Sequence, residues 1–354
     1  MQNVISQVDP FLNNDEQDAI VECIQDRWLT EGKYTEKLIE EFSELTSCKY
    51  VLPVPNGTLG LYLALLALDL PRGSEVIVPS FTFFGSVSAI YFAGLTPRFV
   101  DVSEDDYMSC ADNFRQAINN KTSALMPIHI YGGSANMLPI LELAAENGLK
   151  VVEDAAQAVG VYHRGLHCGT LGDIGVFSFF ADKTVTMGEG GMVTTSCSLI
   201  YEKLKLLRNQ GRPNSGTFVH PTFGMNFRIT DMQAAVGYHQ LKKLPEITDK
   251  KRKIYSQYVD RLKHLPGIKT QVLKDYSTFV PFRFAFTSKL KEILIKELEK
   301  NRIQTRGFFY PMHKQPAVLE KFPRYKNVNL PVSEKLHDEG LCLPIHLNID
   351  ETKV

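Results

Sequence analysis

Lys183 has the surroundings of a reactive amine. It follows the mostly apolar run 177–181 after a single residue, Asp182, and comes shortly before the glycine-rich stretch 188–191. A lysine that leaves an apolar strand loses part of its hydration, which lowers its pKa and makes the amine nucleophilic. A lysine on an exposed loop would explain the same pattern. Ser178, five residues earlier, offers a hydroxyl for an anion, or is a small residue of a buried strand.

Asp154 is the candidate acid. It ends the run Lys150-Val151-Val152-Glu153-Asp154, which is typical of a buried strand. Parallel sheets bind ligands at the carboxyl ends of their strands. A carboxylate in such a low-dielectric position needs a cationic or hydrogen-bonding partner. The protonated ring nitrogen of a cofactor and a structural arginine both meet this need, and the residues alone do not choose between them.

Two further segments offer groups for a phosphorylated aromatic ligand. Gly57 and Thr58 stand where a helix begins, so their N–H and O–H groups suit a phosphate, although an ordinary helix cap is the alternative. Phe83 follows another strand and either stacks on a flat ring or belongs to the core. Together with Lys183 and Asp154, these groups match what pyridoxal phosphate requires of a protein.

The elements that must position these residues alternate along the chain. We expect strands at 50–53, 75–78, 98–102, 123–127, 150–153, 175–179 and 192–195. We expect helices at 16–27, 35–45, 59–68, 85–93 and 137–147. Short, continuously apolar strands that alternate with helices predict an α/β fold with a mostly parallel sheet covered on both faces.

The pattern changes after Leu244. A long helix is expected at 246–265, a strand-like segment at 278–287, a charged helix at 289–301 and an aromatic stretch at 308–311. For a chain of 354 residues, two domains are a reasonable expectation. We therefore divide the chain into a large α/β domain, 1–245, and a smaller α+β domain, 246–354.

Composition excludes several classes of protein. The chain carries 39 Lys+Arg and 40 Asp+Glu, and 44% of its residues are hydrophobic, so it is expected to be globular and not to bind nucleic acid. It lacks the GxGxxG, GxxxxGK[ST], HExxH and GxSxG motifs of dehydrogenases, P-loop NTPases, zincins and serine hydrolases. Scattered cysteines without a CxxC pair argue against a zinc site and for reduced thiols. With no signal peptide or membrane span expected, we predict a cytoplasmic protein.

The sequence as a whole closely resembles the sugar-aminotransferase family of fold-type-I pyridoxal-phosphate enzymes, often called the DegT/DnrJ/EryC/StrS family. The stretches that carry the resemblance are PNGTLGLYLAL, VIVPSFTFF, FVDV, PIHIYGG, VVEDAAQAVG, GTLGDIGVFSFFADK, GEGG and GMNFRITDMQAAVG. The ending IQTRGFFYPMHKQP is particularly similar to perosamine-synthase-type members, which aminate carbon 4 of a nucleotide-linked 4-keto-6-deoxyhexose. Gly307 departs from those members, which usually have Pro after the Arg.

The resemblance implies a role for each residue that faces the cofactor. Lys183 would bind pyridoxal 5'-phosphate covalently and later move the proton between the substrate and cofactor carbons. Asp154 would pair with the ring nitrogen, Gln157 would contact the cofactor near its phenolic oxygen, and Phe83 would stack on the ring. The phosphate would be held by Gly57, Thr58 and Ser178.

The resemblance also implies a homodimer with shared active sites. Asn226 and Arg228 would reach the neighbouring site, where Asn226 would touch the phosphate and Arg228 the carboxylate of the amino donor. Tyr310 and His313 would approach the sugar. The implied reaction moves the amino group of L-glutamate to a nucleotide-linked keto sugar, in the synthesis of amino sugars for surface polysaccharides such as the O-antigen of lipopolysaccharide.

Three alternatives remain open at this point. Two are enzymes on the same scaffold, a carbon-3 sugar aminotransferase and a sugar dehydratase, and some dehydratase relatives have His in place of the lysine. The third is a regulator that binds pyridoxal phosphate without catalysis. The presence of Lys183 together with Asp154 favours transamination over the last two.

Overall fold

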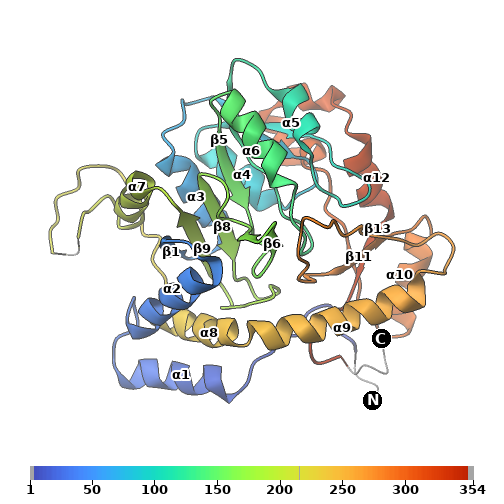
Figure 1. Ribbon diagram of the computed structural model, residues 1–354, viewed down its shortest axis with the longest axis horizontal. Coiled ribbons are helices and arrows are strands. Elements are labelled where there is room, and N and C mark those ends of the chain that lie inside the picture. The colour runs from blue at the N-terminus through green and yellow to red at the C-terminus, as the bar shows by residue number, and fades with distance from the viewer. Residues whose placement is uncertain (1–3, 215, 350–354) are drawn as a thin grey trace.

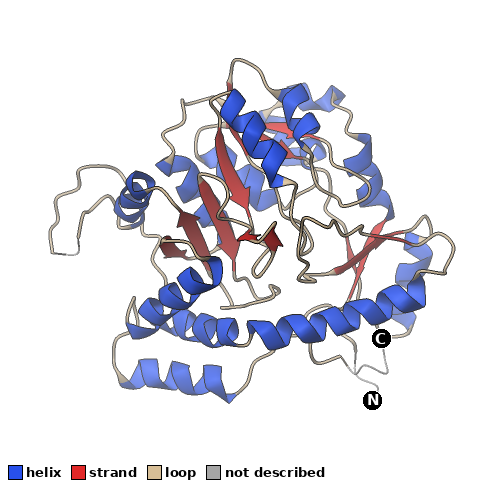
Figure 2. Ribbon diagram, viewed as in Figure 1, coloured by secondary structure: helices blue, strands red, loops and turns tan. Residues whose placement is uncertain are grey.

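The first part of the chain is built on a seven-stranded sheet, seen in the computed structural model, which describes residues 4–214 and 216–349 (Figures 1 and 2). Its strands are β1 (Tyr50–Val54), β2 (Glu75–Pro79), β3 (Thr96–Val100), β4 (Thr122–Leu125), β5 (Lys150–Asp154), β8 (Ile174–Ser178) and β9 (Gly191–Thr195). Their order is β1-β9-β8-β5-β4-β2-β3. Strands β3, β2, β4, β5 and β8 pair in parallel, whereas β9 is antiparallel to both of its neighbours. The predicted α/β fold with a mostly parallel sheet is confirmed.

Helices pack on both faces of this sheet, as the alternation of side chains along a strand requires. In β8, Val176 lies in a core cluster with side chains of α3 (Gly57–Ala67), α4 (Phe84–Phe92) and α7 (Ser198–Arg208). The next residue, Phe177, lies in a second cluster with α1 (Asn14–Gln25), α2 (Lys33–Thr46) and α8 (Asp231–Lys242). The remaining elements of this part are α5 (Ala111–Ala117), α6 (Met137–Glu146) and the hairpin of β6 (Tyr162–His163) and β7 (Leu166–His167).

A second, four-stranded sheet follows α9 (Leu244–Leu262), the long helix that continues from α8 along one side of the molecule (Figure 1). Its antiparallel order is β10-β11-β13-β12, with β10 (Lys269–Thr270), β11 (Phe284–Thr287), β13 (Gly340–Leu343) and β12 (Arg306–Gly307). The helical segments around it are α10 (Lys291–Lys300), η1 (Met312–Lys314), α11 (Pro316–Lys321), η2 (Pro323–Asn327) and α12 (Pro331–Glu339). Tyr255 and Tyr258 of α9 pack against Phe284 of β11.

The strand expected at 278–287 is shorter, because only Phe284–Thr287 pairs in the sheet; Pro281 lacks the N–H group that a central strand would need. The division into 1–245 and 246–354 remains a proposal. All strands of the first sheet lie before that boundary and all strands of the second lie after it.

Candidate active site

The start of α3 forms the predicted phosphate cradle. The first amides of an α-helix have no acceptor within the helix. The Asn56 side chain takes the N–H of Leu59 at 2.9 Å, which leaves the amides of Gly57 and Thr58 for a ligand. A Cβ atom on Gly57 would lie only 2.9 Å from the Cβ of Ser178, so the helix start abuts the carboxyl end of β8. The fold therefore places the three residues predicted to hold phosphate together.

Phe83 stands at the neighbouring helix start, in the N-cap position of α4. A Cβ on Gly85 would lie 2.6 Å from the Thr58 hydroxyl oxygen and 3.2 Å from Cδ1 of Phe83, so the starts of α3 and α4 are in close contact. Phe83 is 61% exposed, which excludes the core position that its sequence allowed. Its ring is free to stack on a planar ligand.

Asp154 ends β5 and is only 6% exposed. Its Oδ2 accepts a hydrogen bond from the Ser86 hydroxyl at 2.7 Å, and its Oδ1 accepts the N–H of Ala156 at 3.1 Å. Ser86 Oγ lies 3.0 Å from Thr82 Oγ1. In the described part of the chain no arginine or lysine forms an ion pair with Asp154, so the structural-arginine alternative has no support. The carboxylate can still receive a cationic ring nitrogen.

The strand end that carries Asp154 is fixed by its neighbour. The fully buried Glu153 accepts N–H groups from Gly169, Leu171 and Gly172 at 2.7–2.8 Å. Its Oε2 also lies 2.9 Å from Nε2 of His129, whose backbone N–H bonds the Asp154 carbonyl at 3.0 Å. These bonds leave the end of β5 little freedom to move.

Gln157 is oriented by the adjacent segment. The Tyr131 N–H donates to Gln157 Oε1 at 2.8 Å. Because an N–H group can bond only to the amide oxygen, the NH₂ group of Gln157 is the end that remains for a ligand. A donor in that position suits the phenolic oxygen of the cofactor.

Lys183 lies in the loop after β8. Although the residue as a whole is partly exposed, burial of its amine lowers the pKa of Lys183 to about 8, against the opposing effect of the Asp182 and Asp154 carboxylates. Its Nζ lies 4.7 Å from the centre of the Phe282 ring. A larger fraction of this amine is neutral at pH 7 than of an ordinary lysine, which is what a nucleophile requires. The influence of Asp154 on Lys183 also places the two in one site.

Asn226 and Arg228 lie in a different environment. Arg228 donates from Nη1 to Asn209 Oδ1 at 2.6 Å, and its Nε is 4.0 Å from Glu31 Oε2. The Arg228 backbone N–H bonds Asn226 Oδ1 at 3.1 Å. None of the contacts among the described residues joins this pair to Lys183 or Asp154. Residues 209–214 and 216–225, which precede them, belong to a loop that projects from the body of the protein (Figure 1).

Tyr310 and His313, the predicted sugar contacts, differ in exposure. Tyr310 is 43% exposed, whereas His313 is fully buried. Both nitrogens of His313 are occupied, Nδ1 at 2.7 Å from Ser80 Oγ and Nε2 at 3.2 Å from Glu334 Oε1. Burial lowers the pKa of His313. Tyr310 can thus meet a ligand directly, and His313 is placed to hold the end of β2.

Sequence reasoning missed Ser86, Thr82, Glu153 and His129. Thr82 and Ser86 are four residues apart, but Thr82 precedes α4, so helix periodicity did not indicate that their hydroxyls lie 3.0 Å apart. Asp154 was correctly expected at a strand end, but its supporting bonds come from segments that are distant in sequence.

These residues fit pyridoxal phosphate. The start of α3, where Gly57 leaves no room for a side chain, suits the phosphate; the buried Asp154 carboxylate suits the ring nitrogen; and Lys183, whose pKa is lowered to about 8, suits the aldehyde. When bound, that cofactor supplies the electron sink for carbanion chemistry. The fold and the site define a pyridoxal-phosphate-dependent aminotransferase.

Comparison with known proteins identifies the family. The chain belongs to the DegT/DnrJ/EryC1/StrS aminotransferase family, whose profile matches residues 10–354. A GDP-perosamine synthase of Escherichia coli O157:H7 is 35% identical over 347 residues, which are 98% of this chain and 94% of the relative. A UDP-N-acetyl-3-dehydro-alpha-D-glucosamine 3-aminotransferase of Acidithiobacillus ferrooxidans is 33% identical over 330 residues, 91% of this chain and 86% of that one. The crystal structure of DesV from S. venezuelae superposes with a TM-score of 0.94 at 30% identity, covering 99% of this chain and 96% of DesV.

Across residues 4–214 and 216–349, no helix is both long enough and apolar enough to span a lipid bilayer.

Proposed function

We propose that this aminotransferase moves the amino group of L-glutamate to the keto group of a nucleotide-linked sugar, at carbon 4 of a 4-keto-6-deoxyhexose. The observation that carries the proposal is the buried Lys183 amine, whose pKa is lowered to about 8, near Asp154, a carboxylate with no cationic partner among the described residues. The nearly full-length similarity to a GDP-perosamine synthase supports the sugar substrate.

The chain's own groups have distinct tasks in this reaction. Lys183, in its neutral form, would hold the cofactor through its aldehyde and would move the proton at the α-carbon of the amino donor. Asp154, held by Ser86 and the Ala156 amide, keeps the cofactor ring nitrogen protonated. The Gly57 and Thr58 amides would hold the cofactor phosphate at the start of α3.

A second chain completes each site in this proposal. Asn226 and Arg228 serve the neighbouring site of a homodimer; in support, their bonds are to each other and to Asn209, and none among the described residues is to Lys183 or Asp154. Tyr310 contacts the sugar, and His313 supports the same region. All six cysteines are free thiols, which fits a reducing compartment, so we propose that the enzyme acts in the cytoplasm on precursors of surface polysaccharides.

A carbon-3 sugar aminotransferase is the second candidate. Its support is the 33% identity to the 3-aminotransferase of A. ferrooxidans. The dehydratase and regulator alternatives are weaker, because both leave the activated Lys183 amine unexplained.

The test is transfer of ¹⁵N from labelled L-glutamate, with pyridoxal phosphate present, to a panel of GDP-, UDP- and dTDP-linked 4-keto and 3-keto sugars, followed by mass spectrometry. We expect one 4-keto sugar to become a ¹⁵N-labelled amine. Lys183→Ala is the matched control and should be colourless and inactive. Labelling of a 3-keto sugar would select the second candidate, and loss of water from the sugar would indicate a dehydratase. If none of the sugars in the panel becomes labelled, the proposal is contradicted.

A further inference from the structure

An arginine of the second sheet lies beside Lys183 of the same chain. Arg306, in β12, donates from Nη1 to Asp182 Oδ2 at 2.8 Å, and Asp182 is the residue that precedes Lys183. The positive charge of Arg306 is among the influences that lower the pKa of Lys183, after the dominant effect of burial. Its guanidinium therefore lies close enough to the amine to act on a substrate held there.

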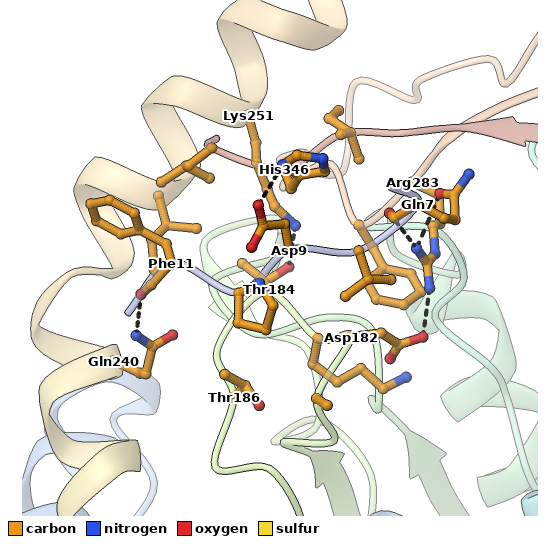
Figure 3. Close-up of a pocket in the computed structure, with 18 residues that line it drawn as sticks. Gln7, Asp9, Phe11, Asp182, Thr184, Thr186, Gln240, Lys251, Arg283 and His346 are labelled. Carbon is orange, nitrogen blue, oxygen red and sulfur yellow. Dashed lines mark hydrogen bonds and ion pairs between the residues drawn. The ribbon is translucent and has the colours of Figure 1, made fainter. Parts of the chain in front are cut away.

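Asp182 does not depend on Arg306 for its charge balance. Arg283 donates from Nη2 to the same Oδ2 atom at 2.5 Å, and this pair is enclosed, with Arg283 4% exposed and the Asp182 side chain 13% (Figure 3). The Arg306 side chain is 55% exposed. Arg306 is thus the outer and replaceable partner of a carboxylate that Arg283 already neutralises.

Most of the binding capacity of Arg306 is unused. A guanidinium has five N–H donors in a planar fork that matches a carboxylate or phosphate. In the described part of the chain, the bond to Asp182 is the hydrogen bond that Arg306 makes. Two arginines and one aspartate leave one net positive charge at this point, which an incoming anion would cancel.

We propose that Arg306 binds the α-carboxylate of the amino donor in its own chain's site, while the partner subunit's Arg228 takes the distal carboxylate of L-glutamate. The inference rests on the proposed function. The bond to Asp182 positions the Arg306 guanidinium. The N–H groups of Arg306 that do not bond Asp182 would then bind the α-carboxylate of the donor.

Bond connectivity favours a carboxylate over the phosphates of a nucleotide sugar. The α-carboxylate carbon is two bonds from the amino nitrogen that reacts beside Lys183. The nearest phosphorus of a nucleotide-linked hexose is six bonds from a nitrogen on carbon 4. The α-carboxylate is therefore the anionic group within reach of an arginine next to the reacting amine, whereas the diphosphate is farther from that amine.

The test combines equilibrium binding with donor selectivity. Calorimetry would measure binding of glutarate, which has two carboxylates but no amine, and of GDP, which supplies the phosphates alone. Arg306→Ala should weaken glutarate binding about 10- to 100-fold, the range for loss of a charged hydrogen-bonding partner, with GDP binding unchanged. Arg306→Lys should give a smaller loss. Arg115→Ala is the matched control, because Arg115 is 56% exposed and has one ion pair with Glu146, far from the site in sequence.

Donor selectivity separates the two arginines. With L-alanine, which has only the α-carboxylate, Arg306→Ala should raise KM as strongly as it does with L-glutamate. Arg228→Ala should raise KM for L-glutamate alone. Normal glutarate binding in both Arg306 variants would overturn the inference, and so would loss of GDP binding with glutarate unaffected. Failure of every amino donor in the wild type would refute the proposed function instead, and the calorimetry would still decide whether Arg306 binds a carboxylate.

Discussion

Two groups of residues assigned to the active site are built differently. The Asp154 group is Asp154 with Ser86 and Ala156, and the Arg228 group is Arg228 with Asn226 and Asn209. Asp154 is buried, and its bonds come from Ser86 and the following backbone of the same chain. Arg228 is partly exposed and bonds a side-chain amide, Asn209, near the carboxylate of Glu31. Asp154 is therefore fixed by bonds within its own chain, whereas the partly exposed Arg228 keeps donors for a ligand, as the proposed role in the neighbouring site requires.

The Arg228 group also has a spare positive charge. Glu31 forms an ion pair with Arg208, which is anchored to the Pro53 carbonyl at the end of β1. Glu31 thus neutralises Arg208 first, and Arg228 is only at the limit of its reach. Asn209 already positions the Arg228 guanidinium, but its positive charge is not neutralised. An anion from a second molecule could therefore bind it.

Asp154→Asn is expected to have the largest effect on the first group. The variant keeps the shape and the bond from Ser86, but an uncharged amide cannot hold a proton on the cofactor ring. The rate of amino transfer should fall by several orders of magnitude, measured by single-turnover absorbance, with the melting temperature little changed. Near-normal turnover would show that Asp154 is structural.

Subunit mixing tests the second group. Lys183→Ala and Arg228→Ala homodimers should both be strongly impaired. If the two variants exchange subunits at equal concentration, half of the dimers are mixed, and one of the two sites in each mixed dimer carries no lesion. Activity should return to about a quarter of wild type by this symmetry. No recovery after verified exchange would mean that Arg228 serves its own chain.

The pH dependence of cofactor binding tests the Lys183 environment. The neutral amine attacks the aldehyde, and burial lowers the pKa of Lys183 to about 8. Below about pH 8 the rate of reconstitution of the apoenzyme should rise about tenfold per pH unit, and above it the rate should level off, as expected for a single ionisation. A rate that still rises to pH 10 would indicate an ordinary lysine.

Lys251 provides the control for this experiment. It is another buried lysine, in a cavity next to the Lys183 loop, and burial lowers the pKa of Lys251 to about 7 (Figure 3). Lys251→Met should leave the midpoint of the reconstitution profile in place. A shift of the midpoint would assign the titration to Lys251.

Ser86→Ala should have the smallest effect. It removes one hydrogen bond to the Asp154 carboxylate but leaves the charge, so cofactor affinity should fall by about tenfold, in line with 1.5 kcal/mol for a bond to a charged group. Equilibrium dialysis with pyridoxal phosphate measures the change. Thr82→Val, which leaves the bond from Ser86 to Asp154, should cost less. An equal loss in both variants would mean that packing, not the bond to Asp154, matters.

The fold was largely predictable because buried parallel strands are continuous apolar runs. All seven predicted strands of the first sheet are present, and Asp154 ends its strand as expected, whereas β8 ends at Ser178, one residue before the predicted end. Helix α8 was not predicted: it packs against both α1 and α2, so it has no single apolar stripe. Ser86 and Arg306 could not be assigned either, because their partners, Asp154 and Asp182, are 68 and 124 residues away in sequence.

Gly57 has a consequence for enzyme engineering. Because a methyl group there would collide with Ser178, the spacing between the two is set by the backbone of α3 and β8 and cannot be adjusted by choice of side chain. A mutant library aimed at new sugar acceptors would gain nothing by randomising position 57. Diversity is better placed at Tyr310, whose exposed side chain can change in size without disturbing the phosphate cradle.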